Sequence, residues 1–300
     1  MESNTKLAGF VITYNREEKI LKSTIEKVLS QTIVPGKLLV LDNGSKSNVK
    51  KLIEGFNNPV LEYHAMGSNI GPAGAANFGL KTLASQNFEW IYWGDDDDPP
   101  LFPDIFEHLI ELGNSISKIG AIGSVGGKFD FSKGLLVRYK DEDLKGLLDV
   151  DSIGGGQNLL ISGTALRETK VFPDAKLFFG FEEFEFLQKL KLKGYRILVS
   201  GESMLKHRIF KDRKGIQVKR SYFLKKSHSA IKRDYYSYRN NIYMFLYKFR
   251  NWRLVFIFIS RALGKMLAGY LKGIPYGNYN FRMMFFSIFD AFRKRMGKTY

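Results

Sequence analysis

The chain has 300 residues, 44% of them hydrophobic, and a formal net charge of +16 at pH 7. This length and hydrophobic content allow one large domain or two smaller ones, and they exclude a disordered chain. The absence of cysteine excludes disulfides, Cys-ligated zinc and thiol catalysis, and it fits a reducing compartment.

The positive charge is concentrated in the C-terminal third. From Lys206 to Tyr300 there are 23 Lys and Arg and three acids, whereas the preceding part has 23 basic and 27 acidic residues. This asymmetry indicates a near-neutral catalytic part and a basic region for an anionic partner, such as phospholipid, a phosphorylated lipid or nucleic acid. Residues Met1–Lys6 lack the apolar core of a signal peptide, and no run reaches the ~18 uninterrupted apolar residues of a spanning helix. We therefore expect a cytoplasmic protein without a membrane span.

The first elements predict a parallel strand–helix–strand unit. Leu7–Thr13 is a β-branched apolar run that ends in polar residues, which is typical of a buried strand and its exit loop. Apolar residues recur at helical spacing from Ile20 to Leu29. Leu38–Leu41 is a second expected strand, and it ends in the polar turn Asp42–Ser45.

A glycine-rich segment follows the third expected strand, Val60–Tyr63. Small residues in Gly67–Asn77 allow close approach of a ligand, and a helix that begins near Pro72 would offer free N–H groups to an anion. A tight glycine turn without a ligand explains the segment equally well. No Gly-Lys-Ser/Thr follows, so this is not a Walker loop.

Four consecutive acids follow the next expected strand, Phe88–Trp93. Asp95–Asp98 lie at its carboxyl end, where open α/β sheets bind ligands, and adjacent carboxylates repel one another unless a cation neutralises them. The sequence therefore predicts a divalent metal that carries a diphosphate. A solvated acidic turn is the alternative, because Asp and Pro also favour turns.

The middle of the chain is less informative. Pro103–Leu112 is expected to be a helix, and Ile119–Val125 and Tyr195–Val199 are expected to be strands. Lys128–Asp149 is ambiguous and is compatible with a hairpin. Asn158–Ile161 reads as a strand after a flexible glycine loop, but its partner in the sheet is not determined by the sequence.

A second functional stretch begins at Phe178. It predicts a helix whose first turn carries Glu182, Glu183 and Glu185. Acids there complement the helix dipole, and a carboxylate against aromatic surface and a neighbouring acid also suits a general base. His207 is one of four histidines; neutral imidazole is a good partner for a manganese-like ion already held by carboxylates.

Taken together, these motifs resemble the family 2 glycosyltransferases of the GT-A fold, especially the rhamnosyl- and galactofuranosyltransferase branch. The resemblance covers about the first 210 residues and depends on an ordered set: Thr13-Tyr14-Asn15-Arg16, Asp42-Asn43-Gly44-Ser45, Asn69-Ile70-Gly71-Pro72-Ala73-Gly74, Asp95-Asp96-Asp97, Glu182-Glu183-Phe184-Glu185 and His207. Tyr235-Tyr236-Ser237-Tyr238-Arg239-Asn240 also looks like a segment of that branch. The resemblance to this family implies a GT-A fold, with a Rossmann-like, mostly parallel α/β sheet in residues 1–210 and a basic helical appendage in 211–300.

The resemblance also implies a set of site residues. Mn²⁺ or Mg²⁺ would be bound by Asp95, Asp97 and His207, and a register shift by one residue makes Asp96 and Asp98 the alternative. Glu183 would be the catalytic base, although the family more often has Asp there, which leaves Glu182 and Glu185 as alternatives. The residues implied in donor binding are Thr13, Asn15, Asp42, Asn69, Gly71, Gly74, Asn77, Asp95 and Asp96.

The implied activity is metal-dependent, inverting transfer of rhamnose, galactofuranose or a similar hexose. The donor would be a UDP- or dTDP-sugar, and the acceptor a glycan or polyprenyl-diphosphate-linked glycan at the inner membrane face. Two alternatives remain: a non-catalytic membrane- or polyanion-binding protein, and a nucleotide-sugar nucleotidyltransferase. Nucleic acid is not an expected partner, and a homo-oligomer is left open.

The basic end predicts amphipathic helices. Arg250, Arg261, Lys265 and Lys272 fall in a narrow arc on a helix, and apolar residues occupy the rest of its circumference. Such a helix suits a membrane interface, with its cations against phosphate groups, but it suits packing onto the catalytic part equally well. A second candidate, with apolar residues from Phe281 to Phe292, precedes Arg293-Lys294-Arg295.

Overall fold

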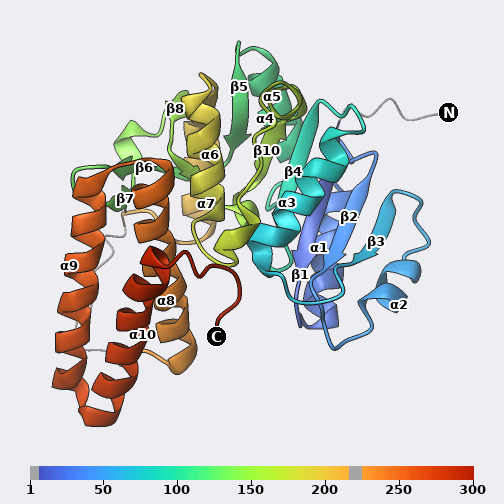
Figure 1. Ribbon diagram of the computed structural model, residues 1–300. Coiled ribbons are helices and arrows are strands. Elements are labelled where there is room, and N and C mark those ends of the chain that lie inside the picture. Colours follow the sequence, from blue (N-terminus) through green and yellow to red (C-terminus); the bar gives the residue numbers. More distant parts are fainter. Residues whose placement is uncertain (1–6, 216–224) are drawn as a thin grey trace.

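A mixed sheet of eight strands forms the centre of the computed structural model, which describes residues 7–215 and 225–300 (Figure 1). Its order is β3-β2-β1-β4-β10-β5-β11-β8. The strands are β1 (Leu7–Thr13), β2 (Leu38–Asp42), β3 (Leu61–Ala65), β4 (Trp90–Asp95), β5 (Ile119–Gly123), β8 (Leu147–Asp149), β10 (Leu159–Ser162) and β11 (Arg196–Ser200). The segment Met1–Lys6, used above to argue against an export signal, lies outside the described residues.

The predicted parallel half is confirmed. Strands β3, β2, β1 and β4 are parallel neighbours. Thr13 is paired with Asp42, and Ile12 is paired with Asp95, so the polar ends of three strands meet at one edge of the sheet. This register brings together residues that are more than 80 positions apart in the sequence.

Strand β10 connects the two halves of the sheet. It runs antiparallel between β4 and β5, with Leu159 opposite Trp93 and Leu160 opposite Ile122. This answers the question of its partner that the sequence left open. Because the strand is antiparallel, its beginning lies beside the end of β4, and the preceding glycines reach Asp95.

Helices cover both faces of the sheet, because side chains alternate along each strand. Leu7 and Val11 of β1 pack with α1 (Glu18–Leu29), α2 (Val49–Glu54) and α4 (Ile105–Asn114). Ala8, Phe10 and Ile12 face the other layer, which contains α3 (Gly71–Ala84), α5 (Gly163–Thr169), α6 (Glu182–Leu192) and Met204 of α7 (Gly201–Phe210).

A small three-stranded antiparallel sheet occupies part of the ambiguous segment. It contains β6 (Gly126–Asp130), β7 (Leu135–Val137) and β9 (Ser152–Ile153), in the order β7-β6-β9. The hairpin interpretation is thus correct for β6 and β7. The chain then returns to the main sheet as β8.

Three long helices follow the sheet: α8 (His228–Tyr243), α9 (Trp252–Ala268) and α10 (Ile274–Phe292). They lie side by side at one end of the sheet (Figure 1). Phe245, just after α8, and Phe258 of α9 share a hydrophobic core with Phe129 and Phe184 of residues 1–210. The division at residue 210 stays a prediction, and the two parts are joined by continuous apolar packing.

Two of the basic residues expected in one arc of this helical segment contact the protein. Arg261 donates to the carbonyl oxygen of Gly134 at 2.8 Å, and Lys265 pairs with Asp234 at 2.8 Å, so these cations face the protein. Leu267 and Leu271 of the same segment are 72% and 83% exposed. Buried carbonyl and carboxylate oxygens attract the cations, which turns part of the apolar face toward solvent.

The helical segment Trp252–Lys272 also has the length and hydropathy of a membrane-spanning helix. Its 21 residues include an 18-residue window with a mean hydropathy of 1.6, of which 33% is buried. We expected no such segment because we counted only uninterrupted apolar runs, and Arg261 and Lys265 interrupt this one. One such helix is weak evidence for a span, since core helices of soluble proteins can meet the same criteria.

Candidate active site

Asp95 lies at the carboxyl edge of the sheet, where β4 ends. Its Oδ2 accepts a hydrogen bond from the backbone N–H of Gly156 at 3.0 Å. Burial raises the pKa of Asp95 to about 7, and the charges of Glu183, Asp96 and Asp97 act in the same direction. The structure therefore brings Glu183 close to Asp95, although 88 positions separate them in the sequence.

Asp96 is held by the loop that follows β1. Its carboxylate accepts a hydrogen bond from Arg16 Nε at 2.8 Å, and its backbone oxygen accepts one from Thr24 Oγ1 at 2.9 Å. Burial raises the pKa of Asp96, while the Arg16 guanidinium opposes this rise. These contacts give Asp96 a structural role and leave it less available as a metal ligand.

Asp97 and Asp98 point to different basic partners. Asp97 is half-exposed and pairs with Arg16 Nη2 at 2.7 Å, while Asp98 lies 3.4 Å from Lys211 Nζ. His207 is buried, which lowers the pKa of its imidazole, and the charge of Asp98 opposes this shift. The imidazole is therefore neutral near pH 7 and available as a ligand.

The expected metal ligands are not assembled into a closed cluster. Within residues 7–215 and 225–300, no three acidic or histidine side chains converge closely enough to form a metal site by themselves. The donor chemistry nevertheless fits a divalent ion, because several carboxylates and a neutral imidazole share this edge and the pKa of Asp95 is raised by its acidic neighbours.

The three glutamates of α6 differ in their surroundings. Glu185 is fully buried and pairs with Lys248 Nζ at 2.6 Å and Lys189 Nζ at 2.9 Å, so its carboxylate is already neutralised. Glu182 and Glu183 face Asp95 instead, since their charges interact with it. Only Glu182 and Glu183 thus contribute to the acidic edge.

Glu183 is the more accessible of these two acids. Glu182 is 4% exposed, and its Oε2 has no hydrogen-bond partner among the described residues. Burial raises the pKa of both carboxyl groups, and the charge of Glu183 raises that of Glu182 further. Glu183 is half-buried, and the backbone of Gly155 hydrogen-bonds it. Solvent therefore reaches Glu183 more readily than Glu182.

The loop before Glu182 has an unusual backbone. Phe178 and Phe181 have φ of +65° and +69°, in the left-handed region that costs a non-glycine residue energy. Asn240 Nδ2 donates to the carbonyl oxygens of Leu177, Phe179 and Gly180 at 3.0, 2.9 and 2.9 Å. Helix α8 thereby holds the loop that carries the acids.

Arg239 supports the same loop from α8. It is fully buried, donates to the carbonyl oxygen of Leu177 at 2.9 Å and to that of Gly297 at 2.8 Å, and lies over the ring of Tyr236. The sequence assigned no role to Arg239 and Asn240. The available signal was the segment from Tyr235 to Asn240, which was noted above only for its resemblance.

The residues expected to bind the nucleoside lie at and near the ends of β1 and β2. Asp42 is buried and accepts hydrogen bonds from Ser45 N at 2.8 Å and from Tyr63 Oη at 3.0 Å. Asn15 has φ of +51° and accepts from Lys46 N at 2.9 Å. Thr13 Oγ1 is buried without a hydrogen-bond partner among the described residues. Tyr63 is a contact of Asp42 that the sequence did not indicate.

The glycine-rich segment is fixed mainly by packing. Gly71 has φ of +77°, and a Cβ there would lie 2.0 Å from the carbonyl oxygen of Phe178. A Cβ at Gly74 would contact the Ile70 side chain at 2.9 Å. Asn69 Oδ1 accepts from Gly71 N at 2.9 Å, and Asn77 Nδ2 donates to the Pro173 oxygen at 2.7 Å. Donor binding by these residues stays a prediction.

Comparison with known proteins identifies the family. The glycosyl transferase family 2 model matches residues 10–171, more than half of the chain, and the chain belongs to this family. The galactofuranosyltransferase GlfT1 of Mycolicibacterium smegmatis is 25% identical over 207 residues, which cover 64% of this chain and 68% of that protein. The family prediction is confirmed, and the protein is a glycosyltransferase of the GT-A fold.

Solved structures support the fold. The mannosyltransferase PcManGT from Pyrobaculum calidifontis, in complex with GDP-Man and Mn²⁺, has a TM-score of 0.54 at 14% identity, covering 96% of this chain and 87% of that one. GalNAc-T7 with UDP, GalNAc and Mn²⁺ has a TM-score of 0.53 at 15% identity, covering 67% of this chain and 43% of that one. This chain thus spans less than half of GalNAc-T7. At such identities the likeness shows the fold alone.

Proposed function

We propose that this glycosyltransferase moves a sugar from a nucleoside diphosphate donor to a hydroxyl group of a lipid-linked glycan, with inversion at the anomeric carbon. The observation that carries the proposal is the approach of Glu183 to Asp95 at the sheet edge where Thr13 and Asp42 also lie. The similarity to a galactofuranosyltransferase supports galactofuranose, rhamnose or a related hexose as the sugar.

Each group has a specific task in this proposal. Asp42, Thr13 and Asn15 bind the base and ribose, and UDP or dTDP is the preferred nucleotide. Glu183 removes the proton from the acceptor hydroxyl as its oxygen attacks the anomeric carbon from the face opposite the leaving diphosphate. A single displacement inverts the configuration and requires no second carboxylate as a nucleophile.

A divalent cation completes the proposed site. Asp95, Asp97 and His207 would hold Mn²⁺ or Mg²⁺, and the two structural neighbours described above were solved with Mn²⁺. When bound, such an ion stabilises the negative charge that develops on the leaving nucleoside diphosphate. Asp97 would exchange its contact with Arg16 for the cation, and Arg16 would keep Asp96 in place.

The proposed setting is the cytoplasmic face of the cell membrane, in the synthesis of cell-envelope polysaccharide. A lipid-linked acceptor is confined to that surface, so an enzyme attached to it meets its acceptor at high local concentration. The basic C-terminal region supplies charge of the appropriate sign for peripheral attachment.

The test is nucleoside diphosphate release from a panel of UDP-, dTDP- and GDP-sugars, with Mn²⁺ or EDTA. We expect EDTA to abolish release and Glu183→Gln to lower turnover with the authentic acceptor on the order of 10²–10⁴-fold, the usual contribution of a general base. Glu111→Gln, an exposed acid on α4, is the control that should keep full activity.

Four results would contradict the proposal. Nucleoside diphosphate release that needs no metal would contradict the role of the cation, and full turnover by Glu183→Gln would contradict the role of Glu183 as the base. Release of pyrophosphate would identify a nucleotidyltransferase instead. A protein that releases nothing but still binds anionic surfaces would be the non-catalytic binding protein.

A further inference from the structure

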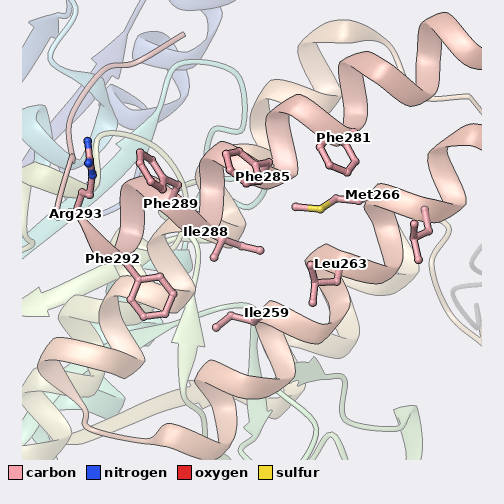
Figure 2. Close-up of a pocket in the computed structure, with 10 residues that line it drawn as sticks. Ile259, Leu263, Met266, Phe281, Phe285, Ile288, Phe289, Phe292 and Arg293 are labelled. Atoms are coloured by element: carbon pink, nitrogen blue, oxygen red, sulfur yellow. The ribbon is translucent and has the colours of Figure 1, made fainter.

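Helices α9 and α10 enclose an apolar groove that is open to solvent. Its volume is about 690 Å³. Phe281, Phe285 and Phe289 are arranged along α10, and Ile259 and Leu263 approach from α9 (Figure 2). Residues four apart lie on one side of a helix, so the phenylalanines form a continuous row.

The groove belongs to a wider exposed apolar surface. Phe281, Phe285, Phe289 and Phe292 are 39–46% exposed. Leu263 on α9 is 49% exposed, and Leu267, Leu271 and Ile274 near the tip of the helix pair reach 70–83%. Contiguous apolar surface of this kind on a soluble face marks an interaction site.

Charge narrows the choice of partner. From Trp252 to Tyr300 there are nine Lys and Arg and a single acid, Asp290, which is buried and accepts a hydrogen bond from Tyr235. Arg253, Arg282 and Arg293 are exposed, and Arg293 itself lines the groove. A second copy of the chain would bring the same positive charge against this surface, which would repel it. The partner must be anionic and must also accept large apolar side chains.

We infer that the α9–α10 face docks on an anionic phospholipid bilayer, with the row of phenylalanines and the exposed leucines of the segment Trp252–Lys272 entering the headgroup boundary and the arginines contacting lipid phosphates. A bilayer interface combines an apolar interior with surface phosphates, whereas nucleic acid offers no apolar depth of this size. The inference deepens the proposed function, because it assigns membrane contact to particular residues. The inward contacts of Arg261 and Lys265 leave the leucines free for it.

The experiment is co-sedimentation of the full chain with phosphatidylcholine vesicles and with vesicles that contain phosphatidylglycerol. The test variant is Leu267→Gln/Leu271→Gln. The matched control is Leu136→Gln/Leu192→Gln, which changes two leucines that are 50% and 74% exposed on β7 and α6. A charge variant, Arg282→Glu/Arg293→Glu, tests the cations.

We expect the wild type and the control to bind anionic vesicles at least tenfold more tightly than neutral ones. The leucine variant should lose at least tenfold in binding to anionic vesicles, and the charge variant should bind both vesicle types equally weakly. Absence of binding by the folded wild type, equal binding of the wild type to neutral vesicles, or unchanged binding by the leucine variant would overturn the inference. So would a dimer in sedimentation that the leucine variant dissociates, since the groove would then hold a second copy.

Vesicle binding is measured without nucleotide or metal, so its result is separate from that of the transfer assay. Loss of vesicle binding with intact nucleoside diphosphate release would refute docking and leave the proposed chemistry in place. Intact docking in a protein that releases no nucleotide would refute the chemistry alone.

Discussion

Replacing Asn240 with Ala tests whether α8 positions the proposed catalytic base, Glu183. The substitution removes the donor to the carbonyl oxygens of Leu177, Phe179 and Gly180, while Arg239 still donates to Leu177. Two carbonyl groups therefore lose this donor, and the buried Arg239 guanidinium loses Asn240 Oδ1 as an acceptor. An unsatisfied buried carbonyl costs about 1–3 kcal/mol, so two amount to roughly 2–6 kcal/mol. The carbonyls of Phe179 and Gly180 are part-buried and can reach water, which favours the lower part of that range.

Opening of the loop also releases its backbone strain. Phe178 and Phe181 adopt positive φ, at a cost on the order of 1–3 kcal/mol each, and keep it only while contacts such as those of Asn240 hold them there. Relaxation would move the first turn of α6, and Glu183 would leave its position near Asp95. Catalysis should therefore fall even in molecules that remain folded.

Two measurements separate these effects. Urea unfolding should show a loss of about 2–4 kcal/mol, the lower part of the range worked out above. Steady-state nucleoside diphosphate release should show kcat reduced at least tenfold, with the KM for donor changed less than twofold, because the residues proposed to bind the nucleoside lie at the ends of β1 and β2.

The neighbouring residue provides the control. Asn241→Ala removes a hydrogen bond to the Ser237 oxygen inside α8, and among the described residues Asn241 makes no hydrogen bond to the loop. It should reduce stability without lowering kcat in the folded protein. Wild-type kcat in Asn240→Ala, or an equal loss of kcat in both variants, would refute the positioning role.

Two further predictions concern a close backbone contact and an ion pair near the site. Gly71→Ala places a methyl group 2.0 Å from the Phe178 carbonyl oxygen at a φ of +77°, so urea unfolding should show a loss of stability above about 2 kcal/mol. Gly264→Ala is the control: this position has open space around it and a helical backbone, so stability should rise by up to about 1 kcal/mol. Equal effects of the two substitutions would contradict the steric argument. Burial alone would raise the pKa of Asp174, but the hydrogen bond and charge of Lys248 outweigh it and lower that pKa. The ionised Asp174 carboxylate therefore stabilises the folded protein fully above the ordinary Asp pKa of about 3.9, and this stabilisation is lost as the pH falls through the lowered pKa. Asp174→Asn should flatten the decline of the urea midpoint below about pH 4. An unchanged decline would show that other groups dominate.

The parallel half of the fold was predictable because its signals are local. Apolar β-branched runs that end in polar turns, as at Thr13 and Asp42, identify a strand and its carboxyl end without knowledge of the rest of the chain. The position of β10 was not predictable in this way. Its four residues have neighbours on both sides that lie far away in the sequence, and nothing in Asn158–Ile161 specifies an antiparallel partner.

The candidate site shows the same division between local and distant information. The resemblance favoured Glu183 among the acids of α6 but left Glu182 and Glu185 as alternatives, because the contacts that distinguish the three come from elsewhere. Lys248, 63 residues further on, neutralises Glu185, and Asn240 holds the loop before Glu182. The direction of Arg261 and Lys265 was likewise set by Gly134 and Asp234, which helical periodicity does not include.

The position of β10 in the sheet has a consequence for folding while the chain is still being synthesised. The sheet consists of one half made of β3, β2, β1 and β4 and another made of β5, β11 and β8, and β10 is the strand that joins them in the described structure. Until Leu159–Ser162 leaves the ribosome, the inner side of β4 is an unpaired edge with Ile91 and Trp93 unprotected. An open apolar edge favours pairing with other chains. A fragment that stops before residue 159 should therefore aggregate, while one that includes the strand can close the sheet.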